Sequence, residues 1–200
     1  DSTNLDTGTL TVSIPSGGDS AEDVLSIRNQ GTGAGQIGVS GSNVTYQGVT
    51  IGTFTGGSVG SNLVITLNSS ATPTSVTALV KNITYENTDM SAPTTGARTV
   101  RYVLTDGDGG TSANYDTTVT VSGVNDAPVL TNGGSVGAGE DSGGNPFFGV
   151  VTVTDPDSAD FNGGTLTASI SAGGESTDKL RLLAIGGVSL SGSNVLVSGV

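Results

Sequence analysis

The sequence contains an internal repeat whose period does not divide the chain into whole copies. Residues 157–176 match residues 1–20 at 11 of 20 positions, and the pentapeptide at residues 40–44 returns at residues 191–195. The offset falls from 156 to 151 between these two matches, so the second copy lacks five residues. A period this long exceeds the ~20–50 residues of a solenoid turn, and each copy should therefore be a domain with its own core. About one and a third copies fit into the 200 residues, which predicts a segment of a tandem array.

Short alternating runs of apolar, mostly β-branched residues predict β-strands. In the first copy these runs lie at residues 10–14, 63–67, 100–104 and 119–121, and in the second at residues 151–153, 166–170 and 180–182. The 33 Gly and 6 Pro supply turns between them. The spacing predicts an all-β fold of antiparallel sandwich type.

One segment has helical spacing. Its apolar residues fall at positions 76, 79, 80 and 83. Thr72 suits the N-cap and Pro73 the first helical position. We expect a short helix near residues 73–83 that bridges two strands and covers one end of the sandwich.

A boundary between copies is expected near Pro128, which cannot continue a central strand ladder. Residues 1–126 then form one repeat and residues 127–200 the first part of the next. Residues 128–156 have no counterpart in front of Asp1, so the first repeat is expected to lack its opening strands.

The charge excludes several classes of partner. Eighteen acidic and six basic residues give a net charge of −12. A nucleic-acid-binding protein needs a basic surface, and an anionic membrane surface would repel this chain. No apolar run reaches the ~18 residues that a membrane span requires.

The chain contains neither His nor Cys. Their absence excludes Ser-His-Asp and Cys-His catalysis and zinc sites built on imidazole or thiolate. A carboxylate pair could in principle hydrolyse glycosides. The acids, however, lie in Gly-rich turns without any Trp to bind a sugar, so we expect no enzymatic activity.

Oxygen ligands remain, and they cluster in turns where calcium could bind. Calcium takes six to eight oxygens from carboxylates, amides and carbonyls. A single Asp-x-Asp turn is more often only a solvated turn, because Asp caps turns with its own side chain. Seven acids and one asparagine gather near the predicted boundary or in turns: the acids at positions 106, 108, 126, 140, 141, 155 and 157, and Asn125.

Three motifs carry a resemblance to a known family. Residues 100–110 (Val-Arg-Tyr-Val-Leu-Thr-Asp-Gly-Asp-Gly-Gly) and the linker Val-Asn-Asp-Ala-Pro at 124–128 resemble the close of a cadherin repeat. Residues 151–158 (Val-Thr-Val-Thr-Asp-Pro-Asp-Ser) resemble the calcium-binding Asp-x-Asp turn of that family. The whole chain looks most like the cadherin-like repeats of large bacterial surface proteins and adhesins. The resemblance implies cadherin- or immunoglobulin-like β-sandwiches with Ca²⁺ between successive domains.

The resemblance also implies which residues bind calcium. Asn125 and Asp126 of the linker would share one junction with Asp155 and Asp157 of the following domain. The acidic linker is shorter here than is usual in the family, which bears on the number of ions at each junction.

Three further residues are implied at other junctions. Asp106 and Asp1 would serve the preceding junction, because Asp1 occupies the position matched by Asp157. Glu140 would face the following junction.

The function implied is mechanical and extracellular. We expect a calcium-stiffened stalk or filament segment of a bacterial cell-surface protein that contributes to adhesion, with neighbouring repeats as partners. Two other classes remain open: a self-assembling fibre or surface-layer subunit, and an accessory module of a secreted enzyme. Because the first repeat lacks opening strands, its sheet edges should act as templates for another strand. We therefore expect the isolated segment to associate by strand exchange.

Overall fold

The structure is a computed structural model that describes residues 4–58, 60–131, 133–139, 143–146, 151–184 and 186–197. It divides into two units, Asp1–Val124 and Asn125–Val200. The first residue of the second unit lies two positions before the domain start expected from the sequence. Each unit is described by itself below.

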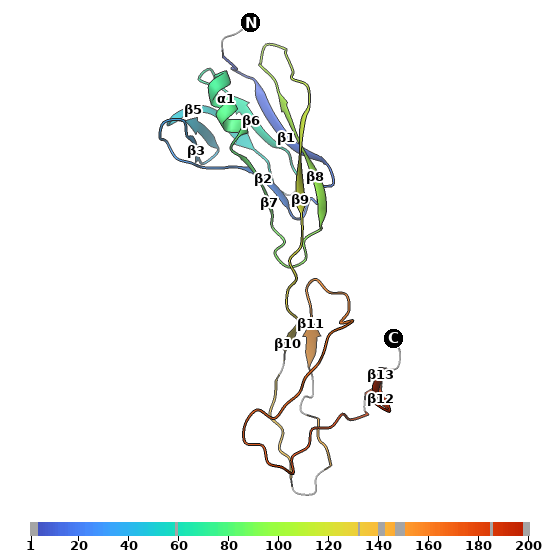
Figure 1. Ribbon diagram of the computed structural model, residues 1–200. Coiled ribbons are helices and arrows are strands. Elements are labelled where there is room, and N and C mark those ends of the chain that lie inside the picture. The colour runs from blue at the N-terminus through green and yellow to red at the C-terminus, as the bar shows by residue number, and fades with distance from the viewer. Residues whose placement is uncertain are drawn as a thin grey trace. The chain divides into compact units, whose positions relative to one another are not determined.

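Unit 1 is built from nine strands and one helix among its described residues (Figure 1). They run in the order β1 (Thr9–Ser16), β2 (Asp23–Ile27), β3 (Ile37–Ser40), β4 (Asn43–Tyr46), β5 (Val49–Thr55), β6 (Leu63–Leu67), α1 (Pro73–Val80), β7 (Ile83–Asn87), β8 (Gly96–Leu104) and β9 (Tyr115–Val121). A seven-stranded sheet has the order β3-β4-β5-β6-β1-β8-β9, and β2 pairs with β7 in a separate two-stranded sheet. All of these pairings are antiparallel. The predicted all-β, sandwich-like fold with a single short helix is confirmed, while the cadherin- or immunoglobulin-like class stays a prediction.

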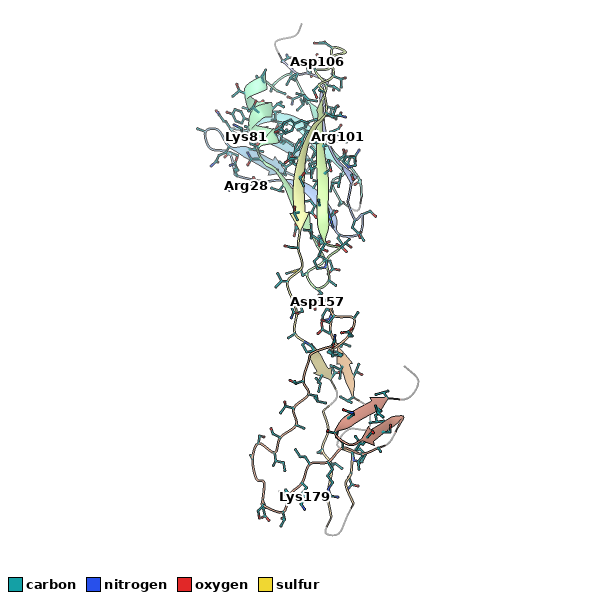
Figure 2. All side chains as sticks on the ribbon, turned by 45° about the vertical axis from the view of Figure 1, so that its right-hand side comes forward. Arg28, Lys81, Arg101, Asp106, Asp157 and Lys179 are labelled. Atoms are coloured by element: carbon teal, nitrogen blue, oxygen red, sulfur yellow. The ribbon has the colours of Figure 1, made fainter. Side chains whose placement is uncertain are left out.

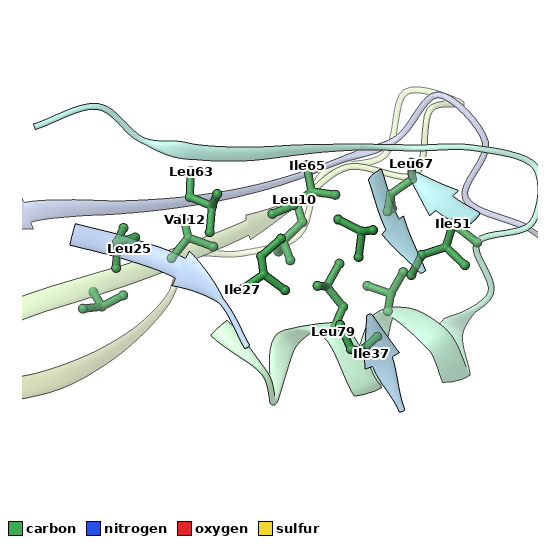
Figure 3. Close-up of a cluster of buried hydrophobic side chains, with 14 residues drawn as sticks. Leu10, Val12, Leu25, Ile27, Ile37, Ile51, Leu63, Ile65, Leu67 and Leu79 are labelled. Carbon is green, nitrogen blue, oxygen red and sulfur yellow. The ribbon is translucent and has the colours of Figure 1, made fainter. Parts of the chain in front are cut away.

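The core lies between the two sheets and under α1. Figure 3 shows Leu25 and Ile27 of β2 pointing toward Leu10 and Val12 of β1. Leu79 of α1 joins the same cluster. The alternation seen in the sequence is therefore an alternation of buried and less buried positions, with Leu10 and Val12 almost fully inaccessible to solvent.

Gly57 shows how tightly β2 is held on its outer side. The amide of Leu25 donates a hydrogen bond of 2.6 Å to the carbonyl of Gly57. A Cβ at Gly57 would lie 2.2 Å from the Leu25 carbonyl oxygen, and φ is +91° there. Only glycine satisfies both conditions, so the β5–β6 turn can close onto the edge of β2.

α1 begins as the sequence predicted. Thr72 is the N-cap and Pro73 the first helical residue, and Thr72 and Ser75 exchange side chain–backbone hydrogen bonds in a capping box. The helix ends at Val80. The predicted helix end at residue 83 is wrong, because Ile83 is the first residue of β7 and pairs with Ile27.

Unit 2 contains two separate hairpins among its described residues. One pairs β10 (Val129–Thr131) with β11 (Thr152–Thr154), and the other pairs β12 (Val188–Ser191) with β13 (Asn194–Val197). The β12–β13 hairpin repeats β3–β4 at the offset of 151 seen in the sequence. Gly41 and Gly192 occupy the same turn position with φ of +58° and +62°.

The strands predicted at residues 166–170 and 180–182 are not formed. Leu166 is 83% exposed, although its counterpart Leu10 is buried in β1. In unit 1, β1 is held between β6 and β8. Residues 125–200 hold no counterpart of β6 or β8, and an apolar alternation without a neighbouring strand has no ladder to join.

Candidate functional site

The β10–β11 hairpin brings the linker and the Asp-x-Asp turn to one end of unit 2. Val129 lies opposite Thr154, so the residues before β10 and those after β11 leave the same end of the ladder. Asn125 and Asp126 belong to the first group, and Asp155 and Asp157 to the second. The register therefore gathers four predicted ligands into one neighbourhood.

Hydrogen bonds fix the turn and connect it to the linker. Oδ1 of Asp155 accepts from the amides of Asp157 and Ser158 at 3.3 and 3.2 Å. Oδ2 of Asp157 (labelled in Figure 2) accepts from the amide of Asp126 at 3.0 Å. Nδ2 of Asn125 donates to the carbonyl of Asp126 at 2.7 Å. Asp126 and Asp155 are partly buried, whereas Asn125 and Asp157 are exposed.

The carboxylates nevertheless do not form a finished metal site. Across the residues that the structure describes, no group of three or more acidic side chains has an arrangement that could hold an ion. The backbone contact at 3.0 Å sets the separation of the linker from the turn. Side-chain rotation at Asp126, Asp155 and Asp157 would be needed before their oxygens could face one ion.

Asp106 lies in unit 1, in the turn between β8 and β9 (Figure 2). Its Oδ1 accepts 2.9 Å hydrogen bonds from the amides of Asp108 and Gly110, and these bonds lower the pKa of the Asp106 carboxyl below its usual value. A Cβ at Gly107 would lie 2.0 Å from the carbonyl oxygen of Asp6, so this turn packs on the backbone that leads into β1. The other two predicted ligands, Asp1 and Glu140, lie outside the described residues.

A buried ionic network in unit 1 was not predicted from the sequence. Nε of Arg98 lies 3.1 Å from Oδ2 of Asp23, and their side chains are only 1% and 3% exposed. Tyr85 donates its hydroxyl proton to Oδ1 of Asp23, and the amide of Asp19 donates to Oδ2 at 2.7 Å. Burial acts to raise the pKa of Asp23, but the hydrogen bonds from Tyr85, Asp19 and Arg98 outweigh it and the pKa is lowered.

Glu22 extends this network to the β7–β8 loop. Its Oε2 accepts from Nδ2 of Asn87 and from the amide of Thr94, both at 2.9 Å. The Thr94 hydroxyl lies 3.0 Å from Oε1 of Glu22 and from Oδ2 of Asp19. Protein donors thus satisfy these acids, and the network acts as a clasp between β2, β7 and β8.

The sequence held a faint signal of this clasp. In unit 2 the amide of Glu175 donates to Oδ2 of Asp178 at 2.8 Å, which repeats the bond between Asp19 and Asp23 one residue closer together. Because both copies carry an acid at the position of Asp23, the sequence could have indicated that Asp23 has a structural role. Its partner Arg98 lies 75 residues away, however, and no local pattern links the two.

α1 is eight residues long, and the described part of the chain has no helix with the length and apolarity needed to cross a membrane. Comparisons of the chain with known protein families, curated proteins and solved structures found no match.

Proposed function

We propose that this chain is a structural and adhesive segment of a repetitive bacterial surface protein. Calcium stiffens the junctions between its cadherin-like β-sandwiches, and the neighbouring repeats are its partners. The repeat at offsets of 156 and 151 supports the tandem arrangement. The hairpins β3–β4 and β12–β13 support it independently, because the same turn forms in both copies.

The contact between Asp126 and Asp157 carries the calcium part of the proposal. It joins the linker to the Asp-x-Asp turn, so that three carboxylates and one amide side chain occupy one end of the β10–β11 hairpin. Three like charges at this spacing repel one another unless a cation intervenes, and the chain is already strongly anionic. Calcium fits because all the available ligands are oxygens.

The expected affinity is that of an extracellular module, with Kd of ~10⁻⁴–10⁻³ M. Calcium at about ten times Kd would stabilise the native state by about 1.4 kcal/mol, if it binds only that state. We expect thermal melts in calcium and in chelator to differ accordingly, and isothermal titration to give a matching Kd.

Asp157→Ala should shrink the calcium-dependent shift in Tm. Asp160→Ala is the matched control, since Oδ1 of Asp160 caps a turn by accepting from the amide of Asn162 at 2.9 Å and belongs to no predicted ligand set. Equal calcium responses in the wild type and both variants would remove Asp157 from the site. No calcium response in the wild type at millimolar concentration would overturn the calcium proposal.

We expect the segment to have no catalytic activity of its own. The reason is chemical: without His the chain lacks the commonest general base, and without Cys it lacks a thiolate nucleophile. Turnover of a polysaccharide or peptide that is lost on mutation of one acid would contradict this expectation and favour a role within a secreted enzyme.

A further inference from the structure

β3 forms one edge of the seven-stranded sheet, because only β4 pairs with it among the described residues. The amide of Gln47 donates to the carbonyl of Gln36 at the start of this ladder. An antiparallel ladder alternates every second residue, so Gly38 directs its backbone groups toward β4. The backbone groups of Ile37 and Val39 therefore point away from the sheet, where an unpaired edge would accept a further strand.

A segment of unit 1 already occupies this edge. The amide of Val39 donates to Oδ1 of Asn29 at 3.2 Å, and Nδ2 of Asn29 donates to the carbonyl of Val39 at 3.2 Å. The amide of Gln30 donates to the carbonyl of Ile37 at 2.7 Å, and the amide of Ile37 donates to Oε1 of Gln30 at 3.1 Å. Asn29 and Gln30 thus satisfy all the edge-facing backbone groups of Ile37 and Val39. We call residues 28–36, which connect β2 to β3, the edge strap.

The edge strap lies close against β3 at Gly38. A Cβ at Gly38 would lie 2.7 Å from the carbonyl oxygen of Gly31 and 2.5 Å from Oγ1 of Thr45. Gly38 is not one of the glycines with a positive φ, so its backbone conformation would suit other residues as well. The close approach of the edge strap is therefore the reason for a glycine at this position.

The second copy of the repeat lacks both the edge strap and this glycine. Ser189 occupies the position of Gly38 at the offset of 151. Residues 28–36 shorten there to residues 183–187, which contain neither Asn nor Gln. β12 and β13 nevertheless pair as β3 and β4 do. The hairpin therefore forms without an edge strap, so the strap has a role other than hairpin formation.

Charge does not protect the edge of β3. Residues 29–80 contain no Asp, Glu, Lys or Arg, although the chain carries a net charge of −12. Natural proteins protect sheet edges with charged side chains or with a covering loop, among other devices. Of these two devices, β3 has only the covering loop. The same lack of charge means that two copies meet no local repulsion at β3.

A second copy of the chain offers a matching edge. Two β3 strands related by a two-fold axis at Gly38 would place Ile37 of each copy opposite Val39 of the other. In an antiparallel ladder, this pairing uses the same backbone groups that now bond to the edge strap. The edge strap is tethered to β3, which gives it a higher effective concentration at this edge than a second copy has.

We infer that the edge strap masks a docking surface, the edge of β3, whose partner is the β3 edge of a second copy of this chain. Displacement of the edge strap exposes the backbone of Ile37 and Val39 and lets two copies join their seven-stranded sheets edge to edge. Each copy contributes the same surface, so the contact closes as a dimer. This inference goes beyond the proposed function and does not depend on a calcium site.

Sedimentation of Asn29→Ala tests the mask. Asn29 is exposed, so the substitution removes its two hydrogen bonds to Val39 without emptying the core. We expect this variant to associate at least tenfold more tightly than the wild type. Asn43→Ala is the matched control, because it removes the same exposed side chain from β4 of the same hairpin and should sediment like the wild type. Equal sedimentation of the two variants would overturn the inference.

Amide hydrogen exchange locates the contact. In dilute Asn29→Ala protein, the amide of Val39 should exchange faster than in the wild type, because its acceptor is gone. At high concentration the second copy should protect this amide again, whereas the amide of Gly38 should stay protected throughout by β4. Unchanged protection of Val39 in the dilute variant would contradict the masking role of Asn29. Association without renewed protection of Val39 would place the interface elsewhere and equally refute the inference.

Gly38→Ser displaces the edge strap by a second route. The added Cβ leaves no room for the carbonyl of Gly31, while Ser189 shows that the same hairpin accepts serine at this position. We expect this variant to keep the circular dichroism spectrum of the wild type and to associate as Asn29→Ala does. A folded Gly38→Ser chain that sediments like the wild type would show that an uncovered β3 edge does not bind a second copy.

Discussion

At the scale of single residues, Asp23 and Arg98 are the most consequential pair in unit 1. Both side chains are almost completely buried, and each is held by further hydrogen bonds, to Tyr85 and to the carbonyls of Thr94 and Gly96. A buried ion pair adds little net stability compared with an apolar pair of similar volume. Removal of one partner is different, because it leaves the other charge buried without compensation.

Arg98→Met should therefore destabilise unit 1 by about 3–5 kcal/mol. Urea unfolding followed by circular dichroism measures the loss. Arg101→Met is the matched control, since Arg101 also pairs with an aspartate, Asp116 at 2.8 Å, but both side chains are over 30% exposed. This control should lose much less stability. Equal losses in the two variants would contradict the argument that removal of Arg98 is costly because it leaves Asp23 buried and unpaired.

The lowered pKa of Asp23 gives a pH dependence with a definite sign. The folded-state pKa lies below the unfolded value of about 3.9. The carboxylate therefore contributes stability above the unfolded pKa and loses it as the pH falls through the folded pKa. The stability gap between the wild type and Asp23→Asn should narrow as the pH is lowered from about 5 to below 3. Urea midpoints across this range measure the gap, and a constant gap would show that Asp23 does not titrate in this way.

At the scale of elements, local chemistry made the start of α1 predictable and left its end ambiguous. Thr72 and Pro73 are specific signals for a helix N-terminus, and the structure begins the helix there. Ile83 fits helical spacing from Leu79, but it also alternates with Tyr85, and pairing with β2 decides in favour of a strand. The strands expected in unit 2 failed for the same reason, because pairing partners determine strands and local pattern only permits them.

Thr72→Ala should cost about 1 kcal/mol of stability through loss of the capping box. Thr77→Ala serves as the control on the same helix. Thr77 is exposed and its hydroxyl donates to the carbonyl of Pro73, while alanine is the better helix former, so little change is expected. Denaturant unfolding measures the free energy of unfolding of both variants. Similar losses would show that the capping box of Thr72 does not stabilise the helix specifically.

At the scale of the whole chain, the two units differ in how completely they bury their apolar residues. Unit 1 has a contiguous core, whereas Phe161, Leu166 and Leu182 of unit 2 are all more than half exposed. The repeat was readable from the sequence, and so was the grouping of the linker with the Asp-x-Asp turn at one end of the β10–β11 hairpin. Calcium binding by these residues stays a prediction. The clasp around Asp23 was not readable, because it depends on contacts between residues that are far apart in sequence.

Limited trypsin digestion should reveal this difference. Of the six basic residues, Lys179 and Arg181 lie in exposed, irregular segments of unit 2, whereas Arg98 is buried in a strand. We expect the first cuts after Lys179 and Arg181, leaving unit 1 intact by mass spectrometry. First cleavage after Lys81 or Arg28 would contradict the expectation that unit 1 resists trypsin better than unit 2.

The ion pairs of unit 1 also have a consequence for how copies meet in solution. Arg98 and Arg101 are both engaged with aspartates, which leaves four other basic residues against a large excess of acids. Two copies therefore approach as polyanions, and their mutual repulsion extends over about 10 Å in 0.1 M salt. Leu130, Val151 and Val153 carry no charge and are about half exposed, so the β10–β11 hairpin presents a small neutral surface on an otherwise anionic chain. Ionic strength then becomes the variable that controls the encounter: dilute buffer keeps copies apart, and screening by salt lets them meet.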